Sequence, residues 1–133
     1  MRTRNAILAA CLLTAGGGMA LAEEAGLAEY QNACASCHGA SAMGDGPMAE
    51  FMTLKVPNLR TLSADNDGVF PMLDVIHVID GRTGVRGHGT EMPIWGAAFR
   101  DEIAGEVGRY GGEVAARGRI LSLAYYLESI QDG

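Results

Sequence analysis

Two cysteines and a histidine in the pentapeptide Cys34-Ala35-Ser36-Cys37-His38 form the chemically most specific group in the sequence. Two thiols at this spacing can each add across one vinyl group of a haem, and the adjacent imidazole can ligate its iron. The pentapeptide therefore predicts one haem c with iron, attached covalently through Cys34 and Cys37, with His38 as the proximal ligand.

Two other uses of a cysteine pair fit the sequence less well. A structural zinc site needs four ligands, usually from two spaced pairs, and here only His77 and His88 remain, without a second cysteine pair. A thioredoxin-like redox pair needs a preceding strand, whereas the segment before Cys34 is expected to be helical. Covalent haem is the interpretation that both comparisons favour.

A ligating imidazole needs its second nitrogen held by an acceptor, which fixes the tautomer and the plane of the ring. The turn Gly44-Asp45-Gly46-Pro47 follows His38 closely in the sequence. We expect a backbone carbonyl of this turn to accept the hydrogen bond, with Pro47 as the first choice and Pro57 as the second.

The sixth ligand decides between electron transfer and chemistry at an open iron position, because a thioether there makes a stable electron carrier. Met92 is favoured because it precedes Pro93 and is followed by Ile94 and Trp95, which we expect to clamp its side chain beside the haem. His88 is the second choice, and His77 is expected to be a partly buried histidine without a ligand role. The remaining candidates, expected to pack as ordinary side chains, are Met43, Met48, Met52 and Met72.

The first 22 residues are typical of a secretory signal peptide. Arg2 and Arg4 form a basic start, an apolar run spans residues 6–13, and Ala20-Leu21-Ala22 fits a cleavage site. We therefore expect export to the periplasm, cleavage after Ala22 and no stable membrane insertion. An uncleaved anchor is one alternative, and a lipoprotein site ending at Cys11 is another.

Removing residues 1–22 leaves about 110 residues, which is enough for one core, so 23–133 is expected to be one domain. The whole chain has a formal charge of −6, and the predicted signal peptide contributes two arginines and no acid. The mature chain is therefore strongly acidic, which disfavours nucleic acid and favours redox partners with a basic docking face. We expect a monomer.

Apolar spacing predicts three helices, over residues 26–35, 71–79 and 115–131. A strand competes with the second helix because Val75 to Ile79 is rich in β-branched residues. Residues 48–54 are expected to form one or two helical turns, residues 81–89 a loop, and residues 99–112 one helical turn plus a loop. The expected fold is all-α, with three to five short helices and long loops wrapped around one haem.

The chain resembles the class I monohaem cytochromes c of bacterial respiratory and photosynthetic chains. The resemblance runs from Gly26 to Gln131 and rests on Gly26-x-x-x-Tyr30-x-x-x-Cys34-x-x-Cys37-His38, Gly44-Asp45-Gly46-Pro47, Pro57-Asn58-Leu59, Ile79-Asp80-Gly81, Met92-Pro93-Ile94-Trp95 and Tyr126-Leu127. It implies a helical fold around a c-type haem, with His38 and Met92 on opposite faces of the haem. It also implies that the first and last helices cross near Gly26, Tyr30 and Tyr126. The loop after Gly81 has no counterpart in the pattern.

The function expected from these features is one-electron transfer by a soluble periplasmic carrier, not an enzyme. A haem subunit of a dehydrogenase or oxidase complex is an alternative, because the same pattern occurs in the haem domains of larger complexes. A peroxidase-like or gas-binding protein with an open iron position is a further alternative.

The predicted processing can be tested by mass spectrometry of protein isolated from the periplasm of an expressing bacterium. We expect a mature chain that begins at Glu23 and carries the added mass of one haem. A mass that includes residues 1–22 would contradict the cleavage, and an unmodified mass would contradict the cofactor.

Overall fold

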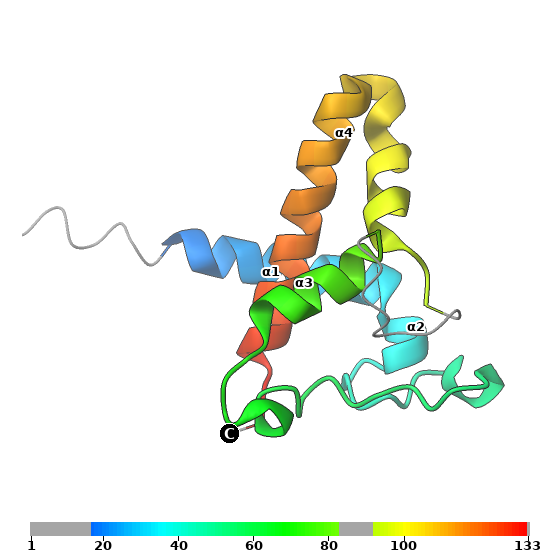
Figure 1. The fold of residues 1–133 in the computed structure, drawn as a ribbon, viewed down its shortest axis with the longest axis vertical. Helices are drawn as coiled ribbons and strands as arrows, with labels where there is room; N and C mark the ends of the chain where they lie inside the picture. The colour runs from blue at the N-terminus through cyan, green and yellow to red at the C-terminus, as the bar shows by residue number, and fades with distance from the viewer. Residues whose placement is uncertain (1–16, 83–91, 133) are drawn as a thin grey trace, which may run out of the picture.

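The computed structural model describes residues 17–82 and 92–132, which form helices joined by long loops (Figure 1). The helices are α1 (Gly17–Ala33), α2 (Ala35–His38), α3 (Met72–Asp80) and α4 (Trp95–Ser129), with 3-10 turns at Ala49–Phe51 and Ala64–Asn66. No strand occurs in the described ranges, so the all-α fold class is confirmed and the strand alternative for Val75 to Ile79 is wrong.

Helix α1 crosses the C-terminal part of α4 at Gly26, as the resemblance implies (Figure 1). A Cβ atom at Gly26 would collide with the backbone carbonyl of Ser122 and would lie 2.7 Å from the Cβ atom of Tyr126. One turn further along α1, the Tyr30 ring packs against the Tyr126 ring at a centroid distance of 5.3 Å. The crossing therefore depends on a residue without a side chain at position 26.

Helix α4 is a hairpin of two arms that lie side by side and extend beyond the other helices (Figure 1). The arms meet at Gly108, whose φ of 74° and ψ of 169° break the helix. The prediction of one helical turn plus a loop over residues 99–112 is therefore wrong. The arms can pack closely because a Cβ atom at Gly112 would lie only 2.7 Å from the carbonyl oxygen of Arg100, and Phe99 is buried.

Helix α3 forms where apolar spacing predicts it, but it buries a different face. Apolar spacing within residues 71–79 groups Leu73, Ile76 and Ile79 on one face, whereas the structure buries Val75 and Ile79 and leaves Leu73 69% exposed. Helix α3 packs against α4, and the buried face is the one turned toward that helix. The predicted range of 71–79 agrees with the observed helix to within one residue at each end, and Gly81 caps the helix in a left-handed conformation with φ of 69°.

The first helix begins earlier than predicted, and parts of two predicted segments lie outside the described residues. Helix α1 begins at Gly17, well before the predicted start at Gly26, and continues past Ala22. Residues 1–16 of the predicted signal peptide lie outside the described residues, as do residues 83–89 of the predicted loop, including His88. None of the described helices is both long enough and apolar enough to span a bilayer.

The crossing of α1 and α4 predicts opposite effects for the same substitution at two helical glycines. Gly26→Ala should destabilise the protein by about 1–3 kcal/mol, because the added methyl group forces the helices apart. Gly118→Ala is the matched control, since nothing lies within 4 Å of its Cβ position. It should stabilise helix α4 by up to about 1 kcal/mol. Urea unfolding measures both, and equal effects would contradict the close crossing.

Candidate functional site

The cysteine pair and His38 lie where α1 runs into the short helix α2. The helical hydrogen bonds continue through Cys34, whose N–H donates to the Tyr30 carbonyl at 2.9 Å and whose carbonyl accepts from the His38 N–H at 2.9 Å. Cys34 and His38 are buried, with 9% and 7% of their surfaces exposed. Cys37 is only half-buried. The sequence after Tyr30 therefore brings one thiol and one imidazole into the interior.

The turn that follows α2 satisfies the carbonyl groups at the end of this helix. The N–H groups of Gly44 and Gly46 donate to the carbonyls of His38 and Cys37 at 2.8 and 3.1 Å. A Cβ atom at Gly46 would lie 2.6 Å from the Cys37 carbonyl oxygen, so the turn can approach α2 only with glycine there. This arrangement leaves Pro47 exposed on the outside of the turn.

The acceptor for the His38 ring is the carbonyl of Pro57, at 3.4 Å from Nδ1. The first choice from the sequence, Pro47, is therefore corrected to the second, Pro57, because the turn holding Pro47 packs against the backbone of α2 and not its imidazole. A carbonyl can only accept, so Nδ1 carries the proton and Nε2 keeps its lone pair. Burial lowers the pKa of His38, and the hydrogen bond to Pro57 opposes this in part. The ring is therefore neutral at pH 7.

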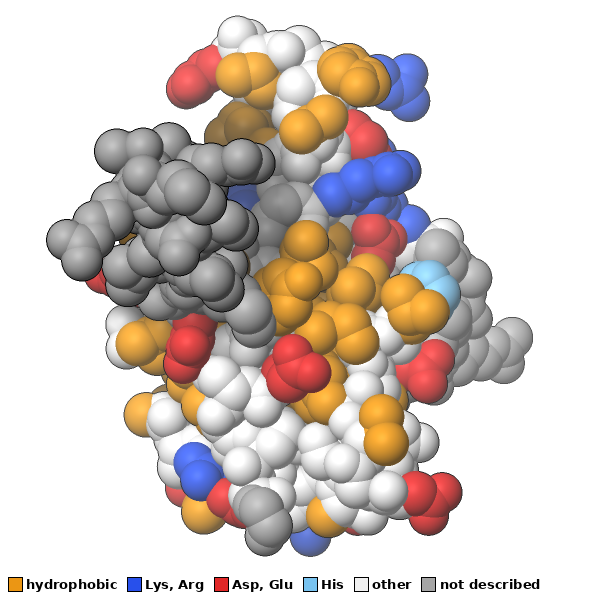
Figure 2. Space-filling model, turned by 90° about the vertical axis from the view of Figure 1, so that its left-hand side faces the viewer, with side chains coloured by type: hydrophobic (Ala, Val, Ile, Leu, Met, Phe, Trp, Pro, Cys, Tyr) orange, Lys and Arg blue, Asp and Glu red, His pale blue; other side chains and the backbone are white. Residues whose placement is uncertain are grey.

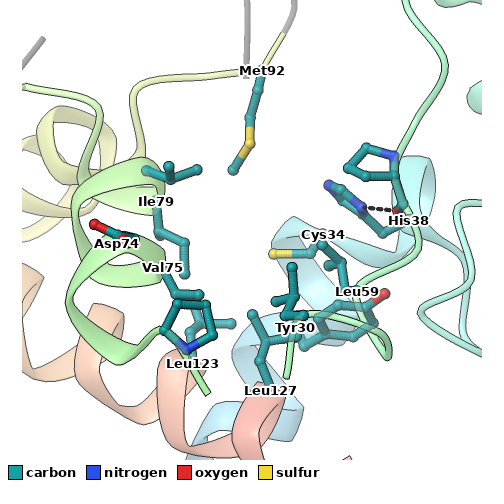
Figure 3. A pocket seen from close by; sticks show the side chains of 14 residues that line it. Tyr30, Cys34, His38, Leu59, Asp74, Val75, Ile79, Met92, Leu123 and Leu127 are labelled. Atoms are coloured by element: carbon teal, nitrogen blue, oxygen red, sulfur yellow. Dashed lines mark hydrogen bonds between the residues drawn. The ribbon is translucent and has the colours of Figure 1, made fainter. Parts of the chain in front are cut away.

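A cavity of about 280 Å³ lies beside His38 (Figure 3). The Cys34 thiol and the His38 ring face it from one side and helix α3 from the other, with Leu123 and Leu127 of α4 below. Its wall is almost entirely apolar and consists of Tyr30, Cys34, His38, Pro57, Leu59, Leu62, Pro71, Asp74, Val75, Val78, Ile79, Met92, Leu123 and Leu127.

Met92 projects into this cavity from a different side than His38, with its thioether directed inward (Figure 3). It is the only methionine of the described residues that lines the cavity. Met43 and Met48 are 53% and 46% exposed, and His77 of helix α3 does not line the cavity either.

Three predicted site residues, Cys37, Pro47 and Trp95, are not part of the cavity wall. Cys37 belongs to α2 and is half-buried. Trp95 is the first residue of α4, and its ring stacks on Phe99 at a centroid distance of 5.3 Å. The structure thus gives Trp95 a packing role at the start of α4, just after the segment that carries Met92.

Burial also controls the chemistry of Cys34. Desolvation, aided by the charges of Glu29 and Cys37, raises the pKa of the Cys34 thiol to about 12. The thiol is therefore protonated at neutral pH and is a weak nucleophile toward oxidants, because the thiolate is the reactive form. Both cysteines are free thiols in the structure. Within the described ranges, no three His, Cys, Asp or Glu side chains are grouped to hold a metal ion.

Much of the cavity wall was not predicted as part of the site. Leu59 belongs to the quoted Pro57-Asn58-Leu59 motif, and Val75, Val78 and Ile79 follow one another at helical spacing. Those spacings predicted an apolar helix, but the predicted face grouped Leu73 and Ile76 with Ile79 in place of Val75 and Val78. They could not indicate that the face covers a cavity, since this depends on how α3 is placed against α1 and α4.

The comparisons with known proteins identify the family. The family model described as Cytochrome c matches residues 23–103, which is more than half of the chain. The chain therefore belongs to the cytochrome c family, whose members carry covalently bound haem and transfer electrons. Searches of the curated proteins and of the solved structures returned no match.

The described residues fit the cofactor that the family implies. A haem is a flat apolar ring with iron at its centre, and the cavity offers a largely apolar wall built from five segments of the chain. The cavity also receives one thiol, one neutral imidazole and one thioether, which are the donor types that c-type haems use. Donor set and wall chemistry agree with a covalently bound haem c.

Tyr30 supports this site from below, and its role gives a testable prediction. Its hydroxyl group is buried and donates to the Gly39 carbonyl at 2.6 Å, next to His38. Tyr30→Phe should destabilise the protein by about 1–3 kcal/mol, because the buried carbonyl loses its donor.

The matched control for this substitution is Tyr110→Phe, since Tyr110 is 84% exposed. Its effect on stability should lie within about 0.5 kcal/mol of zero, as for most surface substitutions. Thermal unfolding of both variants compares them. A Tyr30→Phe variant as stable as the control would show that the Gly39 carbonyl is satisfied in another way.

Proposed function

We propose that the protein is a soluble periplasmic electron carrier with one haem c, ligated axially by His38 and Met92 and attached through Cys34 and Cys37. The observation that carries this proposal is the convergence of the His38 ring, the Cys34 thiol and the Met92 thioether on one apolar cavity (Figure 3). These side chains are brought together from α1, α2 and the segment before α4, so the convergence is a property of the fold.

Haem iron, when bound, accepts and releases one electron at a time. The chain's own contribution begins with His38, which is held neutral by burial and oriented by the Pro57 carbonyl. Its Nε2 lone pair is thereby available for ligation without loss of a proton.

The other described groups adjust the electrostatic environment of the site. The thioether of Met92 is a neutral, soft donor, which raises the reduction potential relative to harder ligands. The leucine and valine side chains of the wall exclude water, and a medium of low dielectric constant disfavours additional charge. Together these groups favour the reduced state.

An acidic surface supports partners with a basic docking face. The formal charge of the whole chain is −6, and the predicted mature chain is more acidic still. Figure 2 shows one face on which hydrophobic side chains gather at the centre, with Asp and Glu side chains below and beside them and Lys or Arg side chains above them. Such a surface suits brief encounters steered by opposite charge, which electron carriers use with donors and acceptors.

The role of Met92 is tested by Met92→Ala in the haem-loaded protein. The variant should lose the far-red absorption band of methionine-ligated ferric haem and bind carbon monoxide rapidly when reduced. Its midpoint potential should fall by at least about 60 mV, a tenfold change for a one-electron couple.

Met48→Ala is the control, because Met48 is the same residue type but 46% exposed and not part of the cavity wall. This variant should keep the band, the potential and the slow reaction with carbon monoxide. An unchanged spectrum in Met92→Ala would eliminate Met92 as the ligand. Rapid binding of carbon monoxide to the unaltered protein would favour the gas-binding or peroxidase-like alternative.

A further inference from the structure

Arg82 joins the end of helix α3 to the second arm of α4 through two carboxylates. Its Nε and Nη2 atoms donate to Asp80 Oδ1 and Oδ2 at 2.8 and 2.6 Å, in a bidentate pair. Its Nη1 and Nη2 atoms donate to Glu113 Oε2 and Oε1 at 2.6 and 3.1 Å. One guanidinium group thus bridges two elements that are far apart in the sequence.

This cluster is shielded enough from water for its hydrogen bonds to contribute more to stability than those of an exposed ion pair. The side chains of Arg82, Asp80 and Glu113 are 24%, 14% and 29% exposed. The hydrogen bond and charge of Arg82 lower the pKa of Asp80. Partly buried, charge-assisted bonds in bidentate geometry are stronger than exposed single ion pairs.

Gly96 in the first turn of α4 closes the remaining side of the cluster. A Cβ atom at this position would lie 2.6 Å from Arg82 Nε and 2.7 Å from Asp80 Cγ. The backbone of α4 therefore packs directly on the ion pair, and Figure 1 shows the end of α3 beside the start of α4. The cluster joins a residue before Met92 in the sequence to a residue after it.

We propose that Arg82 is a positioning residue for Met92: the Arg82–Asp80–Glu113 cluster, packed on Gly96, keeps the Met92 thioether at the haem cavity. This inference rests on the proposed ligation by Met92. A side chain on a segment whose ends are free must lose conformational entropy each time it ligates, and fixing those ends in the fold reduces this cost. The cluster does this without itself touching the cavity, since none of its residues belongs to the wall.

Arg117 provides a matched control because it shares one partner with Arg82 but not its position. Its Nε atom donates to the same Glu113 carboxylate at 3.0 Å, on the same arm of α4, and its side chain is 75% exposed. Removing its charge disturbs Glu113 but leaves the connection between α3 and α4 intact. A change in Met92 ligation that is due to the Arg82–Asp80–Glu113 cluster must therefore be absent from Arg117→Gln.

The experiment is an imidazole titration of the haem-loaded ferric protein, because added imidazole competes with Met92 for the iron. Arg82→Gln should bind imidazole with a dissociation constant about tenfold lower, the change that corresponds to about 1.4 kcal/mol. It should also weaken the far-red band and lower the midpoint potential, whereas Arg117→Gln should match the unaltered protein in all three. Covalent haem and the His38 ligand should be retained in both.

Two further variants separate positioning from general stability. Gly96→Ala keeps all three charged groups but pushes the first turn of α4 off the cluster, so it should change imidazole binding in the same direction as Arg82→Gln. Arg82→Lys keeps the charge but not the fork of donors, so its effect should be intermediate. Circular dichroism confirms that each variant is folded at the temperature of the titration.

The possible outcomes distinguish this inference from the proposal on which it rests. If the unaltered protein lacks the far-red band, ligation by Met92 fails, and the inference fails with it. If the unaltered protein has the band and folded Arg82→Gln, Arg82→Lys and Gly96→Ala bind imidazole as it does, only the positioning role is overturned. An effect in Arg117→Gln as large as that in Arg82→Gln would also overturn the positioning role.

Discussion

The close crossing of α1 and the C-terminal arm of α4 determines where the site can form. Gly26 makes contact at the crossing, and Tyr30, Cys34 and His38 follow at intervals of four residues on the same side of a nearly continuous helical run. All four are buried. The crossing thereby sets the height of the cysteine and the histidine relative to Leu123 and Leu127, which form the floor of the cavity. A shift of α1 along α4 would move both donors out of the cavity at once.

The potential ligand groups in the interior that this crossing creates are uncharged. Burial lowers the pKa of His38 and raises the pKa of Cys34, so both groups are uncharged at neutral pH for the same physical reason. The thioether of Met92 carries no charge at any pH. The three donors that face this largely apolar cavity are neutral, which suits an apolar ring with a metal centre, and Asp74 is the one acidic side chain in its wall. A hydrated divalent cation prefers several charged oxygen ligands.

The sequence was sufficient where function depends on residues close together or on helical spacing. The Cys34-x-x-Cys37-His38 group is a local pattern, and family membership and the all-α fold agree with it. The crossing at Gly26 and Tyr30 was implied by the family resemblance, and the structure has it. The sequence was insufficient where a residue's role depends on contacts between segments that are far apart in the chain. The choice between Pro47 and Pro57 depends on which loop reaches the imidazole, and both prolines occupy turn-like contexts in the sequence.

The long hairpin of α4 is a second feature that the sequence did not predict, because it too depends on contacts between distant segments. Residues 99–112 look polar because the arms cover each other with small residues and charged groups, not with a continuous apolar stripe. Phe99, the buried aromatic residue of this stretch, lies under the guanidinium group of Arg119, 4.0 Å from the ring centroid. Arg119 also donates to Glu29 of α1 and to Glu102 of the first arm. Contacts of this kind bridge distant segments, so periodicity within one segment cannot predict them.

The two sides of the site are therefore held by different kinds of interaction. The His38 side depends on short-range backbone hydrogen bonds between α2 and the turn that follows it. The Met92 side, in the arrangement proposed above, depends on the Arg82–Asp80–Glu113 cluster, which joins the end of α3 to the second arm of α4 across a long sequence separation. The pairs of Arg82 are partly buried, so salt screens them less than exposed pairs, but a condition that removes their charges leaves the backbone hydrogen bonds of the His38 side in place. Conditions that weaken ion pairs should consequently loosen the Met92 side of the cavity before they disturb the His38 side.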